Sequence, residues 1–187
     1  MSPPPEVTVN RRAVIAVPLV CGLLFVGAGC GGGKKKESES TSGPTPTSSV
    51  EKQKFAKTRF VTNAGLAAGA AYQWVIKPYR NGAFKKGADG RTVALVKAGL
   101  AGTFSYNRFK AAVNNAKGDP TLAKAVAPLS AGIDSLKGLT TKFRKGDATD
   151  SDADSFDKVI NNVKDAGKGA GAPVTDQVPS YSDIQKG

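Results

Sequence analysis

The sequence predicts an all-α protein whose folded part is an antiparallel bundle of about four helices, spanning residues 51–170. Two observations lead to this prediction. Apolar residues recur at alternating spacings of four and three along successive segments, which places them on one side of a helix. Prolines and aspartates stand where these segments begin or end, as is typical of helix boundaries. Helices with such rows pack at shallow crossing angles into bundles.

The first helical segment is expected over about residues 51–77. It carries two adjacent apolar rows, so we expect it to be the central helix. Pro78 is expected to end or kink it, because a proline pushes the preceding residue out of helical geometry. One of the two rows consists of Phe60, Ala64, Ala67, Ala71 and Trp74.

Three further segments follow. The second covers about residues 91–116, and the third opens with Asp119 as N-cap and Pro120 at the first helical position, with a bend at Pro128. The fourth, about residues 151–166, starts with a capping-box-like pair, Ser151 and Asp154. The residues that follow, 171–187, are rich in Gly, Pro and Ser and are expected to form a flexible tail. The three apolar rows are Leu95, Gly99, Gly102, Tyr106, Phe109, Val113 and Ala116; Leu122, Val126, Leu129, Ile133, Leu136, Thr140 and Phe143; and Ala153, Phe156, Ile160 and Val163.

Glycines inside the first two segments need a compensating role, because each costs up to about 1 kcal/mol relative to alanine in a helix. Gly65 and Gly69 are four residues apart, as are Ala98 and Gly102. We expect these small faces to let the first two helices approach closely. The alternative is a membrane location for residues 60–76, although Asn63 and Gln73 make that stretch a poor span.

The N-terminal residues read as an export signal. A charged pair, Arg11 and Arg12, precedes an apolar run over residues 13–29 that ends in small residues before Cys30. This stretch resembles a bacterial lipoprotein signal, although Gly27 stands where Leu is usual. The resemblance implies a signal peptide over 1–29 and a lipid such as palmitate on Cys30. Asn10 to Ile15 also looks like a twin-arginine motif, so the export route stays open, as does an uncleaved membrane helix.

Residues 30–50 are rich in Gly, Ser, Thr and Pro and poor in apolar side chains, so we expect a disordered linker that tethers the bundle to the membrane. The predicted location is therefore the extracytoplasmic face of the cell membrane, with the protein held there by lipid.

Composition argues against an enzyme. The chain has no His, which removes the common nucleophile systems and the common zinc sites. Its two cysteines, Cys21 and Cys30, both fall in the signal region, so the bundle has neither thiol nor disulfide. The aspartates after Asp147 fail as a calcium loop because Ser155 and Asn161 occupy its two diagnostic positions. We predict no catalytic residue, no metal site and no cofactor.

Charge points to an anionic partner. Residues 51–145 hold 18 Lys and Arg against 4 Asp and Glu, a balance of +14, whereas residues 146–187 hold 4 against 8 and balance at −4. The connection over residues 77–91 interleaves cations with Tyr79 and Phe84, a mixture that suits a membrane interface or an acidic polymer. Its predicted anion-contact residues are Lys77, Arg80, Lys85, Lys86 and Arg91. A plain basic loop with solvating lysines is the alternative.

The sequence over most of residues 59–145 resembles uncharacterised secreted or membrane-associated proteins of high-GC Gram-positive bacteria. The resemblance includes the stretch FVTNAGLAAGAAYQWVIKPYRNGAFKKGADGR. That resemblance implies a helical domain and no particular activity.

Two kinds of function follow from these expectations. The first is a non-enzymatic envelope interaction module that binds anionic lipid, wall polymer or an acidic protein, with nucleic acid not expected as a partner. The alternative is a carrier of a small molecule or ion, with a pocket between helices around Tyr72, Trp74 and Tyr106.

Overall fold

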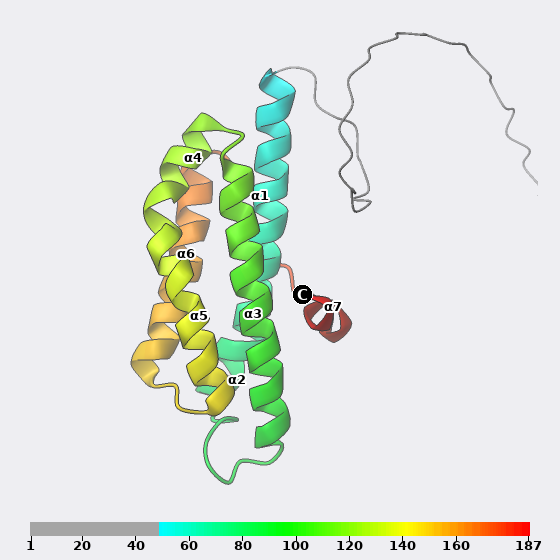
Figure 1. Ribbon diagram of the computed structural model, residues 1–187, viewed down its shortest axis with the longest axis vertical. Helices are drawn as coiled ribbons and strands as arrows, with labels where there is room; N and C mark the ends of the chain where they lie inside the picture. Colours follow the sequence, from blue (N-terminus) through cyan, green and yellow to red (C-terminus); the bar gives the residue numbers. More distant parts are fainter. Residues whose placement is uncertain (1–48) are drawn as a thin grey trace, which may run out of the picture. The chain divides into compact units, whose positions relative to one another are not determined.

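The computed structural model describes residues 49–187, and within them it contains helices and no strand (Figure 1). The predictions for residues 1–29, for Cys30 and for the linker up to residue 48 lie outside the described residues. The helices in chain order are α1 Ser49–Ala71, a π-helical turn η1 Tyr72–Ile76, α2 Lys77–Arg80, α3 Arg91–Ala116, α4 Pro120–Val126, a 3₁₀ turn η2 Ala127–Leu129, α5 Ser130–Lys145, α6 Asp150–Gly169 and α7 Tyr181–Lys186.

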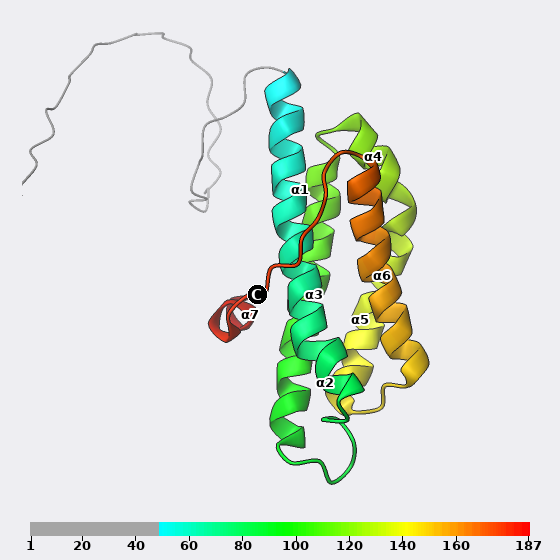
Figure 2. The same cartoon turned by 180° about the vertical axis from the view of Figure 1, so that it is seen from behind.

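The predicted all-α antiparallel bundle is confirmed by α1, α3, α5 and α6. Each of these helices runs opposite to the one beside it, and α6 returns to contact α1 (Figures 1 and 2). The expectation that residues 51–77 form the central helix is wrong. The structure places α3 between α1 and α5, because α3 carries small residues on two sides and can be covered on both.

The core lies where the 4,3 rows predicted. Phe60, Phe109, Ile133, Phe143 and Phe156 are fully buried. Burying one such side chain contributes about 1.5–3 kcal/mol, so these rows dominate the stability of the bundle. Four members of the rows are only half-buried: Trp74, Tyr106, Val113 and Leu129.

Pro78 neither ends nor sharply breaks the first helix, which continues through η1 and α2 to Arg80. Pro78 has no N–H to donate to the preceding turn. The residues before it adopt π-helical geometry, in which the N–H of Lys77 donates to the Tyr72 carbonyl five residues earlier. Widening the turn lets the helix pass a proline, and it also sets Trp74 on this irregular turn.

The helix ends follow the predicted signals with one correction. Asp119 caps α4, its carboxylate accepting from the Leu122 N–H at 2.8 Å, and the predicted bend at Pro128 is the 3₁₀ turn η2. The capping box of α6 is formed by Thr149 and Asp152 rather than by Ser151 and Asp154. The N-cap lies two residues earlier than expected, so the two residues of the capping box shift by the same amount.

The interior glycines do not face one another, which corrects the expected contact between the first two helices. A Cβ added at Gly65 would lie 2.5 Å from the Thr175 carbonyl oxygen, and one at Gly69 would overlap the backbone of Gln177. Both therefore face the C-terminal segment. On α3, a Cβ at Gly102 would lie 2.6 Å from Thr140 Oγ1 on α5. The α1–α3 contact instead uses alanines and a buried bond from Ser105 Oγ to the Ala67 carbonyl at 3.0 Å.

Residues 171–187 also differ from the expected flexible tail. The segment runs along α1 (Figure 2), and the Gln177 N–H donates to the Gly65 carbonyl at 2.9 Å. Lys164 binds Asp176 at 2.9 Å, and Ile184 of α7 is 2 % exposed. Gly65 and Gly69 leave a channel on α1 that the extended backbone of the C-terminal segment fills. The contacts made in this channel are enough to order a segment that is rich in Gly and Pro.

These contacts predict opposite effects for two glycine-to-alanine changes. Gly69→Ala should destabilise the protein by about 1–3 kcal/mol, because the new methyl group overpacks against the tail backbone. Gly138→Ala should stabilise it by up to about 1 kcal/mol, because Gly138 lies inside α5 and nothing stands within 4 Å of an added Cβ. Denaturant unfolding of both variants measures this. A stabilising Gly69→Ala would show that the tail does not lie on α1.

Candidate functional site

The five cations predicted to contact an anion all lie at one end of the bundle, here called the loop end, but they play different parts there. Lys77 and Arg80 begin and end α2, Lys85 and Lys86 stand in the loop over residues 81–90, and Arg91 begins α3. Lys77, Lys85 and Lys86 are exposed, and none of the three forms an ion pair with a residue that the structure describes.

The two arginines hold the loop end together. The Arg80 guanidinium lies 2.7 Å from Asp157 Oδ2 of α6, which joins α2 to that helix. The Arg91 Nε–H donates to the Phe84 carbonyl at 2.9 Å and closes the loop on the start of α3. Their charges are thus partly committed to internal contacts.

The two aromatic residues of the loop end face inward rather than toward a membrane. Phe84 is 6 % exposed. Its ring centroid lies 6.1 Å from that of Tyr79 and 6.3 Å from that of Phe143. The interpretation of these aromatics as a membrane-interface feature is therefore wrong for Phe84, because the hydrophobic interior between α2 and α5 takes up its ring.

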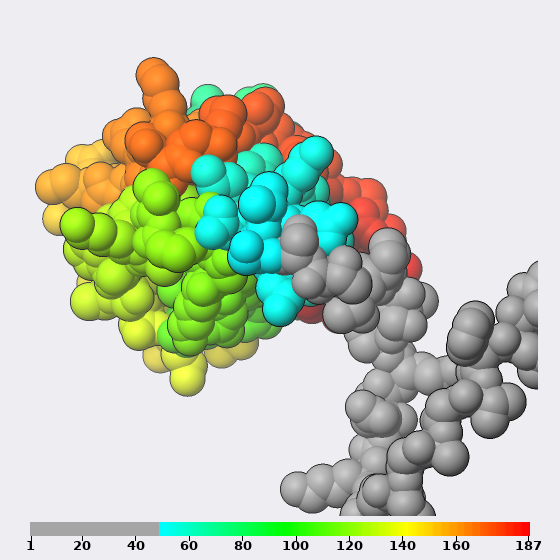
Figure 3. Space-filling model, turned by 90° about the horizontal axis from the view of Figure 1, so that it is seen from above, coloured from blue at the N-terminus to red at the C-terminus, as the bar shows by residue number. Residues whose placement is uncertain are grey.

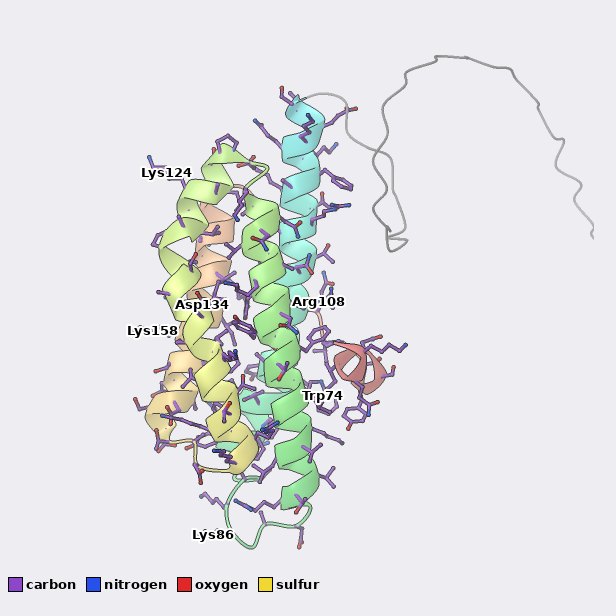
Figure 4. The ribbon with its side chains drawn as sticks, in the orientation of Figure 1. Trp74, Lys86, Arg108, Lys124, Asp134 and Lys158 are labelled. Atoms are coloured by element: carbon purple, nitrogen blue, oxygen red, sulfur yellow. The ribbon has the colours of Figure 1, made fainter. Side chains whose placement is uncertain are left out.

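Acidic residues of α6 lie beside the basic loop. The Tyr79 hydroxyl donates to Asp150 at 2.9 Å, and burial followed by this bond raises the pKa of Tyr79. A depression of about 420 Å³ at this end is lined by Arg80, Lys85 and Lys86 but also by Asp150. The basic and acidic stretches, which are separate in the sequence, meet here, so the loop end carries mixed charge. Lys86 projects from the loop in Figure 4.

Asp152 is the most perturbed carboxylate at this end. The Lys142 ammonium, 2.7 Å from its Oδ1, and then the Thr149 N–H and hydroxyl, at 2.9 and 2.8 Å from Oδ2, lower its pKa from the ordinary 3.8 to about 2. The folded state thus favours the charged carboxylate. This contribution to stability is complete above pH 4–5 or so and is lost as the pH falls toward about 2.

Asp152→Asn should lower the free energy of unfolding by about 1–2 kcal/mol at pH 7, because it weakens the α6 cap and removes the ion pair. The difference from wild type should shrink between about pH 5 and pH 2, where the wild-type carboxylate becomes protonated. Asp154→Asn, an exposed neighbour, is the control and should change stability by less than about 0.5 kcal/mol. Denaturant unfolding across this pH range is the measurement. A pH-independent difference would contradict a stabilising charge on Asp152.

The opposite end of the bundle, here called the α1 end, is where α1 begins, α3 turns into α4 and α6 finishes; Figure 3 views it from above. Lys57 binds the buried Asp119 at 3.7 Å and joins α1 to the α3–α4 turn. Figure 4 marks Lys124 on α4 at this end. Within the described residues, the first turns of α1, the α3–α4 turn with α4 and the last turn of α6 carry five exposed lysines with no ion pair: Lys52, Lys54, Lys117, Lys124 and Lys168.

Two of the three residues of the predicted carrier pocket, Trp74 and Tyr106, line separate cavities. Trp74 lines an open groove of about 570 Å³ between η1, α2 and α3. The Lys97 ammonium lies 5.5 Å from its ring centroid, and the ring of Tyr181 of α7 lies 6.2 Å from it, centroid to centroid. Trp74 is labelled in Figure 4. Tyr106 lines a different pocket between α3 and α5, and Tyr72 is 46 % exposed. The difference arises because the core between the helices is filled by phenylalanine and aliphatic side chains.

Residues 49–187 also bear on two other kinds of site, a metal centre and a membrane-spanning helix. No group of three or more His, Cys, Asp or Glu in that range is placed to hold a metal ion. Nor does any helix of that range combine the length and the apolar content that a membrane crossing requires.

No protein-family model matches the sequence, and neither the curated proteins nor the solved structures include a significant match to it. The functional argument therefore depends on the residues and their geometry.

Proposed function

We propose that this protein is a lipid-tethered, non-enzymatic module of the cell envelope that holds the α1 end of its bundle against an anionic membrane surface. The observation that carries the proposal is the set of five exposed lysines at this end, none of which forms an ion pair with a residue that the structure describes. Each lysine near an anionic bilayer adds about 1 kcal/mol of attraction. The screening length in physiological salt is about 8 Å, so only clustered charges act together.

Helix electrostatics support a role for these lysines outside the fold. Lys52 and Lys54 lie in the first turns of α1, where the helix dipole disfavours positive charge. Glu51 is the acidic residue of that first turn and suits the dipole. Lys168, in contrast, stands in the last turn of α6 and stabilises that helix end. The lysines of α1 are thus placed where they do not help their own helix, which favours an external partner.

The point where the chain enters the bundle also favours the α1 end. Only 18 residues separate Cys30, the predicted lipid site, from Ser49. They span at most about 60 Å when fully extended. The loop end lies a further ~48 Å away along the continuous helix from α1 to α2. A lipid on Cys30 would therefore bring the α1 end to the membrane with much less extension of the 18 connecting residues than the loop end would require.

The anchor is tested first. Cys30→Ser should move the protein from the membrane fraction to the medium or leave an unprocessed precursor. The reason is that the lipid is attached to the cysteine thiol, which serine lacks. Fractionation combined with mass measurement of the mature N-terminus checks this. Unchanged membrane retention, with no lipid mass on the wild-type protein, would contradict lipid anchoring.

The contact surface is tested with two charge reversals of equal size. Lys52→Glu with Lys54→Glu should weaken binding of the unlipidated protein to vesicles containing phosphatidylglycerol by about tenfold or more, because at least two favourable charges are lost. The change should not unfold α1, since acids suit its first turns. Binding of wild type should also fall steeply with salt.

Lys85→Glu with Lys86→Glu is the matched control, because it changes the net charge equally at the loop end. We expect it to weaken vesicle binding much less. Equal losses from the two variants would mean that only total charge matters. A larger loss from the loop-end variant would support the contact predicted from the sequence around Lys77, Arg80 and Arg91 instead.

A further inference from the structure

A polar pocket of about 350 Å³ lies between α3 and α5, in the middle of an otherwise apolar contact. From α3 it is lined by Thr103, Tyr106 and Asn107, which the 3.6-residue period places on one side of that helix. From α5 it is lined by Lys137, Thr140, Thr141 and Arg144, which share one face in the same way. Neither helix contributes an acidic residue to the lining.

Thr140 is the unusual member of this set. It occupies a position in the apolar row of α5 and is 7 % exposed, yet its hydroxyl has no hydrogen-bond partner among the described residues. Two other threonines of the pocket satisfy their hydroxyls within their own helices: Thr103 donates to the Gly99 carbonyl at 3.0 Å and Thr141 to the Lys137 carbonyl at 3.2 Å. A buried unpaired hydroxyl is costly. The Thr140 oxygen lies against Gly102 of α3, so Thr140 forms the closed floor of the pocket.

The glycines of α3 make this arrangement possible. A Cβ at Gly102 would lie 2.6 Å from Thr140 Oγ1, and one at Gly99 would lie 2.7 Å from Cγ and Cδ of Arg144. The absence of both side chains lets the polar face of α5 lie directly on α3. A glycine within a helix lowers the stability of that helix. Gly99 and Gly102 therefore destabilise α3 at the two positions where Arg144 and Thr140 pack against it.

The charges of the pocket are uncompensated. Lys137 and Arg144 are exposed and stand two helical turns apart on the same face of α5. Neither forms an ion pair with any residue from 49 to 187. Asp134, the acid one turn before Lys137, is bound by Lys110 of α3 at 2.8 Å. The pocket thus presents two cations together with hydroxyl and amide donors.

We propose that this pocket binds a phosphate group. Arg144 and Lys137 would neutralise its charge, and the Tyr106 hydroxyl and the Asn107 amide would donate to its oxygens. Several oxygens arranged around one centre match donors that arrive from two helices better than the two oxygens of a carboxylate do. The inference is independent of the membrane contact at the α1 end, because it uses other residues from the middle of the bundle.

The test measures binding by calorimetry, using the full chain carrying Cys30→Ser so that it stays free of lipid. The probes are inorganic phosphate and glycerol 3-phosphate, compared with sodium chloride at equal ionic strength. Both phosphates should bind, and chloride should not. Tighter binding of glycerol 3-phosphate would identify a lipid headgroup or a glycerol-phosphate polymer as the source of the group, whereas tighter binding of inorganic phosphate would identify free phosphate.

Three variants make the proposal falsifiable. Tyr106→Phe keeps the shape of the ring and should leave the melting temperature without phosphate nearly unchanged, while weakening phosphate binding at least tenfold. Lys137→Gln with Arg144→Gln should weaken it at least tenfold as well. Lys85→Gln with Lys86→Gln, which removes as much charge elsewhere, should leave it unchanged. No phosphate binding beyond the chloride control, or equal loss from both double variants, would overturn the proposal.

Discussion

The arrangement of the bundle depends on how closely two helices can approach α3. Ser105 lies on the face of α3 that meets α1, where its hydroxyl reaches the Ala67 carbonyl. Gly99 and Gly102 lie on the face that meets α5. Because α3 is narrow on both faces, it can sit between two helices as the buried centre. The phenylalanines of the core then fill the spaces toward α6 and the helix ends.

The same use of glycine orders the C-terminal segment. Gly65 and Gly69 leave a channel on α1 that is filled by backbone, not by side chains, and the N–H of Gln177 finds an acceptor there. The segment then carries α7 to the bundle, where Tyr181 packs beside Trp74. The C-terminal segment has few large apolar residues, so its order depends on how its backbone fits the channel on α1. The segment also covers part of the surface next to the π-helical turn η1.

Pairing between helices redistributes the charge of the chain. The acidic start of α6 packs beside the basic loop end, and Arg80 with Asp157 and Lys142 with Asp152 form ion pairs across that contact. The large positive balance of residues 51–145 is therefore partly neutralised where the sequence made it look most concentrated. Lys77, Lys85 and Lys86 still lack an ion pair there, and within the described residues further groups of unpaired cations lie in two other places: the α1 end and the pocket between α3 and α5. These two places suit different anions, one an extended charged surface and the other a single phosphate group enclosed by donors.

Local interactions explain which features the sequence by itself determined. The 4,3 rows, the Asp119 cap and the bend at Pro128 depend on neighbours within one or two helical turns, so the helices and most of their buried faces could be predicted. The sequence pointed to the loop-end cations Lys85 and Lys86, because a loop rich in cations is a local pattern. It did not point to the lysines of the α1 end, because they come from segments far apart in the chain. It did not single out Thr140, although a polar residue within an apolar row is a signal that could have done so.

The remaining features were decided only by the tertiary structure, because they join residues far apart in the chain. Which surface Gly65 and Gly102 face depends on which segment packs there, and each packs against a segment that no local pattern identifies. Whether Arg80 is available to a partner depends on Asp157, 77 residues away. Burial of Phe84 depends on Phe143 of α5 in the same manner. Spacing determines the face of a helix on which a side chain lies, but only packing determines what that face meets.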